Sequence, residues 1–332
     1  MKKKVLILID KKGWSYDTIA KGIMSYNSSN IFDIDIEEVK GENIKKVQSI
    51  HKNYDLIFPM GWQFLIGNNT GIKKLFSKYN EQLTFLDREK VITGIHSHRS
   101  WDDYLSLPEK LVLPNKSLIK ELSKLKSINV ISKRLYELFK TAGLNNIVLT
   151  ENGVDHNLFH PTRDINTDNN QPLKVGFSGS TRTKKHDFLK GVTEFILPLQ
   201  NLHNIQVEIL GENTKNRVAR KDMPKLYNQV DLYLCCSTSE GFSQSVLEAA
   251  SCGRCVVTTK VGGCEDLIKE DYNGKFIIRD QEMIKSTLID LEKDRKKVRQ
   301  MGENARISIE NSYTWEKQVK SWISWIESNL SN

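Results

Sequence analysis

Two glutamates eight positions apart, Glu240 and Glu248, flank the start of a predicted helix in the segment EGFSQSVLEAASCG (240–253). The first half of the segment reads as a loop of Gly and Ser, and the second half favours a helix. The N–H groups of a first helical turn, predicted here at 241–245, and the positive end of the helix dipole together form an anion site. The segment therefore predicts a place for a diphosphate group beside two carboxylates.

The two carboxylates suit different partners. Glu248 lies two turns into the predicted helix, and a carboxylate that accepts two hydrogen bonds matches a pair of vicinal hydroxyls such as those of a ribose. Glu240 follows the predicted strand 231–237 and would face the sugar side of the phosphates. The alternative interpretation is that Glu240 stabilises the helix dipole and Glu248 is an exposed helix residue. The spacing alone leaves both interpretations open.

The elements that must position these residues alternate between short apolar strands and helical patterns, which indicates βαβ units and a parallel sheet. The rhythm stops at the polar segment 157–172, interpreted as an interdomain linker, and then restarts. Ligands of such sheets bind at the carboxyl ends of the strands, and with two domains the expected site is the cleft between them. The predicted strands are 4–9, 32–39, 54–60, 90–95, 127–132 and 146–150, then 173–179, 205–211, 231–237, 255–259 and 275–278.

Helices are predicted between these strands and at the end of the chain. The pattern favours helices at 133–142 and 187–199, among others. In the tail, Trp315, Trp322, Ile323 and Trp325 fall on one helix face, as in a helix that packs on the body of the protein.

Composition is that of an ordinary globular protein of two domains, with 332 residues, 39% apolar and 27% charged. The apolar run at 5–9 is shorter than a secretory signal requires, and no run is long enough to span a membrane. Residues 1–160 hold 24 Lys and Arg against 18 Asp and Glu, which leaves +2 of the net +8 for the rest. The basic first half suits an anionic partner such as a lipid surface, a lipid-linked phosphate or nucleic acid. Lysines that merely solubilise helix faces explain the charge equally well.

Five cysteines, an odd number, and the short first apolar run favour reduced thiols in a cytosolic protein. Cys252 and Cys255 have the spacing of a redox motif. They fall where a predicted helix ends and a strand begins, with no second pair of ligands nearby for zinc. A structural role is therefore the favoured interpretation, and redox or metal use is the alternative.

The segment 240–248 resembles the E-x7-E motif of the GT-B-fold glycosyltransferases of family 4, with Gly241 and Phe242 after the first glutamate as in that family. The resemblance covers most of residues 127–280, whereas the first 125 residues match loosely. The flanking segments that carry it are 225–231 (KLYNQVD), 253–257 (GRCVV), 261–263 (VGG) with Glu265, 273–274 (NG), and 151–155 (ENGVD) followed by Phe159 and Pro161.

The resemblance implies an α/β GT-B fold, in which two Rossmann-like α/β/α domains face a central cleft and a C-terminal helix packs back on the body. The implied domains are an acceptor-binding domain at 1–160, a linker at 161–172, a nucleotide-sugar-binding domain at 173–310 and a helix at 311–332 that returns to the first domain.

The resemblance also assigns roles to residues of the second domain. Glu248 would hold the ribose of a nucleotide-sugar donor, and Glu240 would act as a catalytic residue at the transferred sugar. The family's phosphate-binding pair has the form G-R-x4-K after the first strand of this domain, whereas this chain reads GSTRTKK at 179–185. Lys185 falls in register, and Arg182 is the expected substitute for the arginine. The remaining implied donor-binding residues are Gly241, Phe242 and Ser243.

In the first domain the family places a glycine-bearing loop against the donor phosphates, which here implies Gly13. His96 ends the strand 90–95, where the family has a histidine near the acceptor, and is the implied second catalytic residue. A register slip would exchange it for His98. A purely structural histidine is the alternative for either position.

The resemblance implies a retaining transfer from a nucleotide-diphosphate sugar, expected to be a UDP-sugar, without a cofactor or metal. The one D-x-D sequence, Asp33 to Asp35, alternates within a strand and is expected to face solvent. The expected acceptor is a lipid-linked or surface-polysaccharide glycan. The enzyme itself is expected in the cytoplasm, with peripheral contact at the inner membrane face through its basic first domain. A nucleic-acid acceptor is an open alternative. A nucleotide-binding protein of another class is disfavoured because 10–14 (DKKGW) lacks G-x-G-x-x-G.

Overall fold

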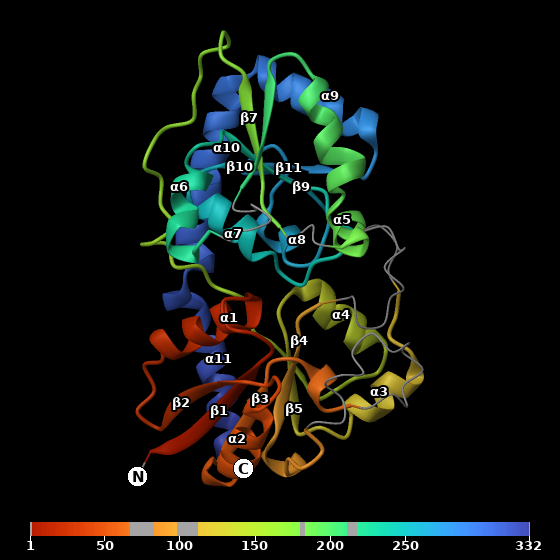
Figure 1. Cartoon of the computed structure of the whole chain (residues 1–332), viewed down its shortest axis with the longest axis vertical. Helices are drawn as coiled ribbons and strands as arrows, with labels where there is room; N and C mark the ends of the chain where they lie inside the picture. Colours follow the sequence, from red (N-terminus) through yellow and green to blue (C-terminus); the bar gives the residue numbers. More distant parts are fainter. Residues whose placement is uncertain (1, 67–82, 98–111, 180–182, 211–217, 332) are drawn as a thin grey trace. The chain divides into compact units, whose positions relative to one another are not determined.

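The computed structural model describes residues 2–66, 83–97, 112–179, 183–210 and 218–331, and leaves the side chain of Lys185 undescribed. Contacts between residues divide the chain into two compact units (Figure 1). Unit 1 consists of Met1–Asp103, Leu111–Gly153 and Trp315–Asn332, and unit 2 of Tyr104–Lys110 and Val154–Thr314. The first domain was predicted to end at residue 160. In the structure the chain passes from unit 1 to unit 2 between Gly153 and Val154, and it returns to unit 1 between Thr314 and Trp315.

Unit 1 is built on parallel strands in the orders β2-β1-β3 and β4-β5-β6. A parallel bridge between Ile57 and Val91 links the two sets. The central strand β1 is apolar and fully buried from Val5 to Ile9, as expected of a strand covered on both faces. The strands are β1 (Lys3–Ile9), β2 (Phe32–Glu38), β3 (Leu56–Pro59), β4 (Ile92–Ile95), β5 (Ser127–Val130) and β6 (Ile147–Leu149).

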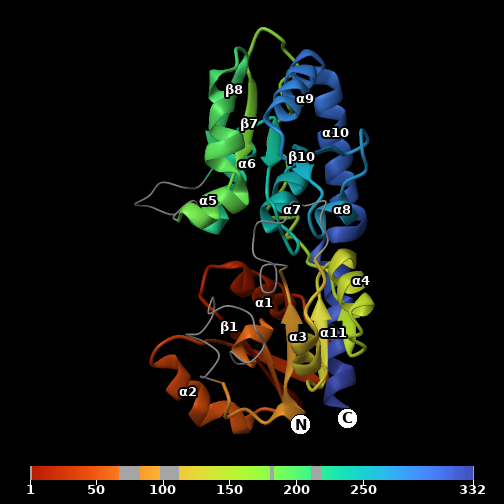
Figure 2. The same cartoon turned by 90° about the vertical axis from the view of Figure 1, so that its right-hand side faces the viewer.

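Helices flank the sheet of unit 1, and the C-terminal helix α11 is one of them (Figures 1 and 2). Its Trp315 packs against Gly22 of α1 so closely that a Cβ at Gly22 would lie 2.2 Å from the indole ring. The Trp322 indole donates to the Glu151 carbonyl at 2.8 Å. The predicted return of the C-terminal helix to the body is therefore confirmed. The helices are α1 (Ser15–Ser25), α2 (Asn43–Ile50), α3 (Lys116–Leu122), α4 (Lys133–Thr141) and α11 (Trp315–Leu330).

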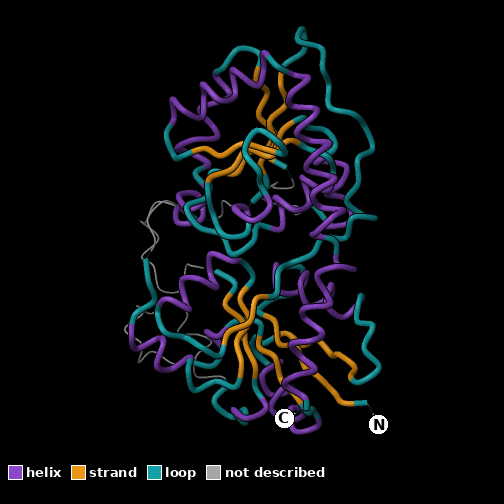
Figure 3. Tube along the Cα trace, turned by 180° about the vertical axis from the view of Figure 1, so that it is seen from behind, coloured by secondary structure: helices purple, strands orange, loops and turns teal. Residues whose placement is uncertain are grey.

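Unit 2 contains a five-stranded parallel sheet in the order β11-β10-β9-β7-β8. Figure 3 shows the strands of each unit in the middle of its layers, with helices outside. The apolar core of unit 2 joins side chains of the sheet, of the segment 192–199 and of the helices α9 (Gln281–Lys293) and α10 (Arg295–Ser308). The strands are β7 (Leu173–Phe177), β8 (Ile205–Ile209), β9 (Leu232–Cys235), β10 (Cys255–Thr259) and β11 (Gly274–Ile277).

The helix predicted at 187–199 is broken in unit 2. The helix α5 (Lys184–Lys190) ends at Gly191, whose backbone is left-handed with φ 67°. A π-helical turn, η6 (Val192–Ile196), and a 3₁₀ turn, η7 (Leu197–Asn201), follow. Glycine adopts positive φ without the steric cost that a Cβ brings, so this position ends the helix. The other helices are η8 (Arg220–Asp222), α6 (Met223–Tyr227), α7 (Gln244–Ser251), α8 (Cys264–Leu267), α9 (Gln281–Lys293), α10 (Arg295–Ser308) and η9 (Ile309–Tyr313).

The polar segment 161–172 packs on unit 2. Arg163 donates to the Gln229 carbonyl at 2.7 Å, and Arg254, which is 1% exposed, donates to the Arg163 carbonyl at 2.9 Å. Ile165 belongs to the apolar core of the unit. The α/β class with parallel sheets is thus confirmed in both units. Among the described residues, no helix combines the length and the apolar character needed to cross a membrane.

Candidate functional site

The candidate site of unit 2 lies where the strand order of its sheet reverses. β7 is paired with β8 on one side and with β9 on the other, so the loops that leave β7 and β9 diverge at their carboxyl ends. Such a switch point is where ligands of open parallel sheets bind. Ser178 follows β7 directly, and the segment 236–243 connects β9 to α7.

Glu240 lies in the β9–α7 segment and forms an ion pair with Lys190, the last residue of α5. The hydroxyl of Ser237 also donates to Glu240 Oε1, at 2.7 Å. The side chains of Lys190 and Glu240 are only 17% and 11% exposed. The pair therefore places a partly desolvated cation and anion together at the switch point.

The helix α7 begins later than the sequence analysis predicted. Ser243 is its N-cap, with an extended backbone at ψ 112°, and the helix starts at Gln244. Gly241 and Phe242 precede the helix instead of forming its first turn, so the predicted turn at 241–245 is wrong in its start. The anion-binding N–H groups of a helix beginning here belong to Gln244 and the residues after it.

The Phe242 side chain is buried and serves packing. Its ring contacts the Tyr313 ring edge to face, with centroids 5.4 Å apart. Gly263 lies against the same ring, where a Cβ would come within 2.3 Å of it. Any contact of Phe242 with a donor would therefore have to come from its backbone.

The β10–α8 loop fixes the backbone that carries Glu240. The Gly263 N–H donates to the Gly241 carbonyl at 2.8 Å. Gly262 has φ 47°, and a Cβ there would lie 2.1 Å from the Gly241 oxygen and 2.4 Å from the Glu240 oxygen. Only glycine permits this approach, so Gly262 holds the Glu240 loop against the end of β10.

Glu248 is buried and hydrogen-bonded, so it is not the exposed helix residue of the alternative interpretation. Its Oε1 accepts from Arg220 Nε at 3.0 Å, and its Oε2 accepts from the Tyr227 hydroxyl at 3.0 Å. The hydroxyls of Tyr227 and Tyr233 lie 3.1 and 3.0 Å from Ser178 Oγ. A polar network thus runs from the end of β7 to the middle of α7.

The pKa of Glu248 reflects two opposing influences, its burial and its charged and hydrogen-bonded partners. Burial raises the pKa of the Glu248 carboxyl above its usual value, and the Arg220 charge and the Tyr227 and Arg220 hydrogen bonds oppose that rise. Burial and the adjacent Glu248 raise the pKa of Tyr227, which keeps its hydroxyl a donor.

A lysine outside the predicted phosphate-binding pair meets Glu240, and the roles predicted for Arg182 and Lys185 stay predictions. Arg182 lies outside the described residues, and Lys185 lies within α5 with an undescribed side chain. The lysine that meets Glu240 is Lys190, which the sequence analysis missed because it counted a fixed spacing from Gly179. The signal that would have found it is the Lys-Gly pair at 190–191, a basic residue in the last helical turn followed by a C-cap glycine.

Gly13 lies in the β1–α1 loop of unit 1. It has φ 75°, and its N–H donates to Asp17 Oδ2 at 2.7 Å. Asp17 is 2% exposed and also pairs with Lys21. Gly13 therefore shapes a turn that begins α1, and its donor-binding role stays a prediction.

His96 follows β4 and is 9% exposed. Its Nε2 lies 3.2 Å from Asn129 Nδ2, which also donates to Thr150 Oγ1 at 2.9 Å. Its ring contacts Tyr16 edge to face at 5.3 Å. Burial lowers the pKa of His96 to about 4, although the Asn129 hydrogen bond opposes the shift. His96 is thus a neutral imidazole near pH 7, and His98 lies outside the described residues.

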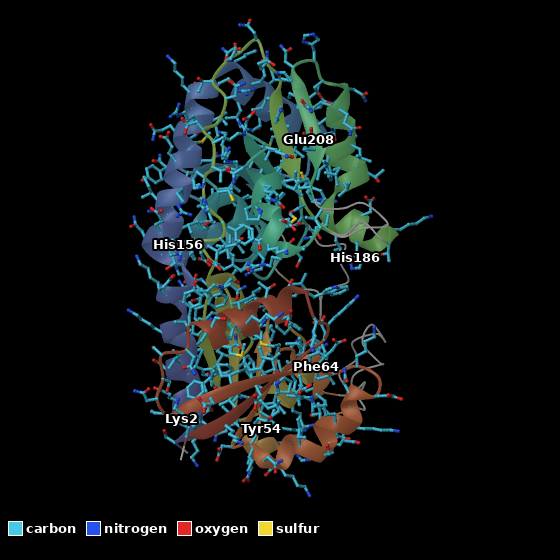
Figure 4. All side chains as sticks on the ribbon, turned by 60° about the vertical axis from the view of Figure 1, so that its left-hand side comes forward. Lys2, Tyr54, Phe64, His156, His186 and Glu208 are labelled. Atoms are coloured by element: carbon cyan, nitrogen blue, oxygen red, sulfur yellow. The ribbon has the colours of Figure 1, made fainter. Side chains whose placement is uncertain are left out.

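The D-x-D sequence lies on the exposed side of β2, as predicted. Asp33 pairs with Lys2, and Asp35 accepts from Tyr54 at 2.9 Å; Lys2 and Tyr54 are labelled in Figure 4. The five cysteines are free and buried. Burial raises the thiol pKa of both Cys252 and Cys255 to about 12, which favours a structural role for this pair.

The sequence of unit 2 is similar to a known family. Residues 200–308, which include η8, Tyr227, Glu240 and Glu248, match the profile described as "Glycosyl transferases group 1". Spore coat protein SA of Bacillus subtilis is 30% identical over 34% of this chain and 30% of its own length. N-acetyl-alpha-D-glucosaminyl L-malate synthase of Bacillus anthracis is 32% identical over 39% of this chain and 33% of its own length. The matches therefore span about a third of these curated relatives.

Solved structures share the fold over the whole chain. Sucrose-phosphate synthase from Thermosynechococcus elongatus superimposes with a TM-score of 0.72 and 11% identity, covering 99% of this chain and 100% of that one. HepE of Anabaena, solved in complex with UDP and glucose, superimposes with a TM-score of 0.69 and 19% identity, covering 99% of this chain and 100% of that one. The fold is that of the GT-B glycosyltransferases.

Proposed function

We propose that this chain is a retaining, metal-independent glycosyltransferase of family 4 that moves a sugar from a nucleotide-diphosphate donor to a hydroxyl of a lipid-linked or surface-polysaccharide acceptor. The observation that carries the proposal is the arrangement at the switch point of unit 2. Glu240, Glu248 and the start of α7 lie there together, within the region that matches the glycosyltransferase profile.

In the proposed donor complex each group of unit 2 has one task. Glu248 accepts hydrogen bonds from the ribose hydroxyls. The first N–H groups of α7 receive the diphosphate. Glu240 accepts from a hydroxyl of the transferred sugar and orients it at the site. Support for such a donor comes from the same fold in HepE, which was solved with UDP and glucose.

The chemical step breaks the bond between the sugar and the diphosphate, so negative charge builds up on the leaving diphosphate. In the proposed mechanism the α7 N-terminus and Lys190 stabilise that charge, and no metal is required. One well-aimed hydrogen-bond donor contributes on the order of 10²–10³ in rate to such a step. Arg182 and Lys185 are the further candidates for this task.

We assign acceptor binding to unit 1. Residues 1–160 carry a net charge of +6, from 24 basic and 18 acidic residues, which suits an anionic acceptor at the cytoplasmic face of a membrane. A relative that is 39% identical over 17% of this chain is named N,N'-diacetylbacillosaminyl-diphospho-undecaprenol alpha-1,3-N-acetylgalactosaminyltransferase, from Campylobacter jejuni. That name describes transfer to a lipid-linked diphosphate, and it supports an acceptor of this class. His96, neutral near pH 7, is the proposed partner of the reacting hydroxyl.

A thermal-shift panel tests the donor half of the proposal. Purified protein is melted with UDP, GDP, ADP, CMP, dTDP, NAD and NADP, each with and without EDTA. A bound ligand raises the melting temperature by mass action. A shift with one nucleoside diphosphate, UDP being expected, that EDTA leaves unchanged supports the proposal. A shift with NAD alone, or with none of the panel, overturns it.

A further inference from the structure

The carboxylate of Glu248 is held by two side chains from outside its helix. Arg220 of η8 approaches a single oxygen, with both Nε and Nη2 at 3.0 Å from Oε1. Tyr227 of α6 donates to the other oxygen, Oε2, at 3.0 Å. Glu248 itself is 7% exposed. Each oxygen of a buried carboxylate is therefore oriented by its own donor.

The hydrogen-bond pattern leaves an acceptor position at Oε2 for a ligand. An ionised carboxylate has about four acceptor positions. A fork-to-fork arginine would occupy both oxygens, whereas Arg220 hydrogen-bonds Oε1 through Nε, and its Nη2 lies 3.0 Å from the same oxygen. Among the described residues Oε2 accepts a hydrogen bond from Tyr227 alone, which leaves a second lone pair for an incoming hydroxyl.

The two donors both contact the Phe159 ring. The Phe159 ring lies 5.0 Å from the Arg220 guanidinium carbon and 6.1 Å, edge to face, from the Tyr227 ring. Phe159 is itself fully buried. Cation–π contact and ring packing thus hold both donors at Glu248.

We propose that Arg220 and Tyr227 are positioning residues for the donor, which keep Glu248 ionised and aimed so that Oε2 accepts the ribose hydroxyls. The inference rests on the proposed function, because it takes Glu248 as the ribose-binding group. Neither residue touches the reacting atoms, and both act through Glu248.

The charges around Glu248 make the idea testable by pH. Arg220 and Tyr227 face it from η8 and α6, and Tyr233 of β9 lies behind Tyr227. At the C-cap of α7, burial raises the pKa of the Cys252 thiol to about 12, and Arg306 of α10 donates to the Ser251 carbonyl at 2.8 Å. Arg220 is thus the cation in direct contact with the carboxylate among the described residues. Without Arg220, burial would be less opposed, so the pKa of Glu248 would rise further.

The experiment measures the dissociation constants of UDP, GDP, ADP and dTDP by calorimetry from pH 5 to 9. The proteins are wild type, Arg220→Met, Arg220→Lys, Tyr227→Phe and Glu248→Gln. Because a terminal phosphate itself titrates near about pH 6, the Glu248→Gln profile supplies the background. Lys221→Met, which removes the next and exposed cation of η8, is the matched control.

The ionised carboxylate binds and the protonated one does not, so affinity falls as pH drops through the pKa of Glu248. In Arg220→Met that fall should move up by about one to three pH units, with about a tenfold loss of affinity for each unit. In Arg220→Lys the pH midpoint of this fall should return most of the way to its wild-type value. Tyr227→Phe should weaken binding about two- to tenfold, and Lys221→Met should match wild type.

Two failures are distinguishable. A wild-type protein that binds none of the four nucleotides overturns the proposed function and the inference with it. A wild type that binds one of them, with the midpoint of Arg220→Met unchanged, overturns the inference alone. Loss of melting temperature in Arg220→Met without a shifted midpoint has the same meaning, because it assigns Arg220 to packing.

Discussion

In unit 1 the strand order reverses between β1 and β3, and in unit 2 it reverses between β7 and β9, so the two sheets offer the same kind of binding edge. The side chains at those edges differ. In unit 2 the carboxylates Glu240 and Glu248 are each paired with a cation, Lys190 and Arg220. In unit 1 the charged residues Asp10, Lys11 and Lys12 follow β1, whereas the groups after β3 and β4 include Gln63 and His96, which near pH 7 are uncharged.

The difference indicates how each edge is prepared for its ligand. Each of the two carboxylates in unit 2 is already paired with a cation, so neither stands as an uncompensated, partly buried charge. The neutral imidazole in unit 1 can accept a proton or a hydrogen bond, which suits a hydroxyl that loses a proton on reaction. The same topology therefore carries different side chains in the two units.

The largest expected effect concerns the charged edge. Glu240→Ala should lower turnover about 10²–10³-fold while changing donor affinity less, because Glu240 is proposed to act on the transferred sugar. Glu248→Ala should instead weaken donor binding. Both are measured as release of nucleoside diphosphate from the donor identified by the thermal-shift panel, with the dissociation constant determined separately.

Glu282→Gln is the matched control, since its carboxylate is 81% exposed and pairs with Lys285 on the surface of α9. It should behave as wild type. If Glu240→Ala and Glu248→Ala both transferred sugar normally, the charged edge of unit 2 would not be the site.

The next effect concerns His96 of unit 1, and its sign follows from the direction of the pKa shift. The pKa of His96 is about 4 in the folded protein and about 6.5 when unfolded. The unfolded chain therefore binds a proton in this window that the folded chain does not, and stability falls as pH drops from 6.5 to 4. The loss amounts to about 3 kcal/mol, and His96→Gln should remove it.

Urea unfolding followed by tryptophan fluorescence measures this effect in unit 1. Of the six tryptophans, the five that are described, Trp14, Trp62, Trp315, Trp322 and Trp325, all belong to unit 1. The exposed His203→Gln of unit 2 is the control and should leave the profile unchanged. An identical pH dependence in His96→Gln and wild type would contradict a neutral, buried His96.

The smallest expected effect compares one glycine of each unit. Gly41 in unit 1 and Gly262 in unit 2 both have positive φ, at 56° and 47°. A Cβ at Gly41 would meet nothing within 4 Å, whereas at Gly262 it would collide with the Glu240 and Gly241 carbonyls. Gly41→Ala should cost about 1 kcal/mol in unfolding free energy, and Gly262→Ala roughly 2 kcal/mol more.

Circular dichroism of urea unfolding gives both values, and calorimetry gives donor affinity. Gly262→Ala should also weaken donor binding, because the loop that carries Glu240 must shift. Equal costs in the two variants, with donor affinity unchanged, would show that the β10–α8 loop does not hold the Glu240 backbone.

Much of the fold could be predicted from the sequence because strand signals are local. Each of the eleven predicted strands overlaps one of β1 to β11, and the tail helix packs through its predicted tryptophan face. The helix at 187–199 was predicted too long, since its pattern continues through Gly191 and only the left-handed backbone there shows the break. The predicted helical turn at 241–245 began too early for a related reason, because Ser243 is extended.

The sequence by itself determined the parallel α/β organisation and the placement of Glu240 and Glu248 beside one strand end, because those depend on patterns within short segments. Tertiary structure alone decided which cations meet them. Lys190 reaches Glu240 from 50 positions away and Arg220 reaches Glu248 from 28. No local spacing encodes such pairs, since they depend on where the chain folds back and on how deeply each carboxylate is buried.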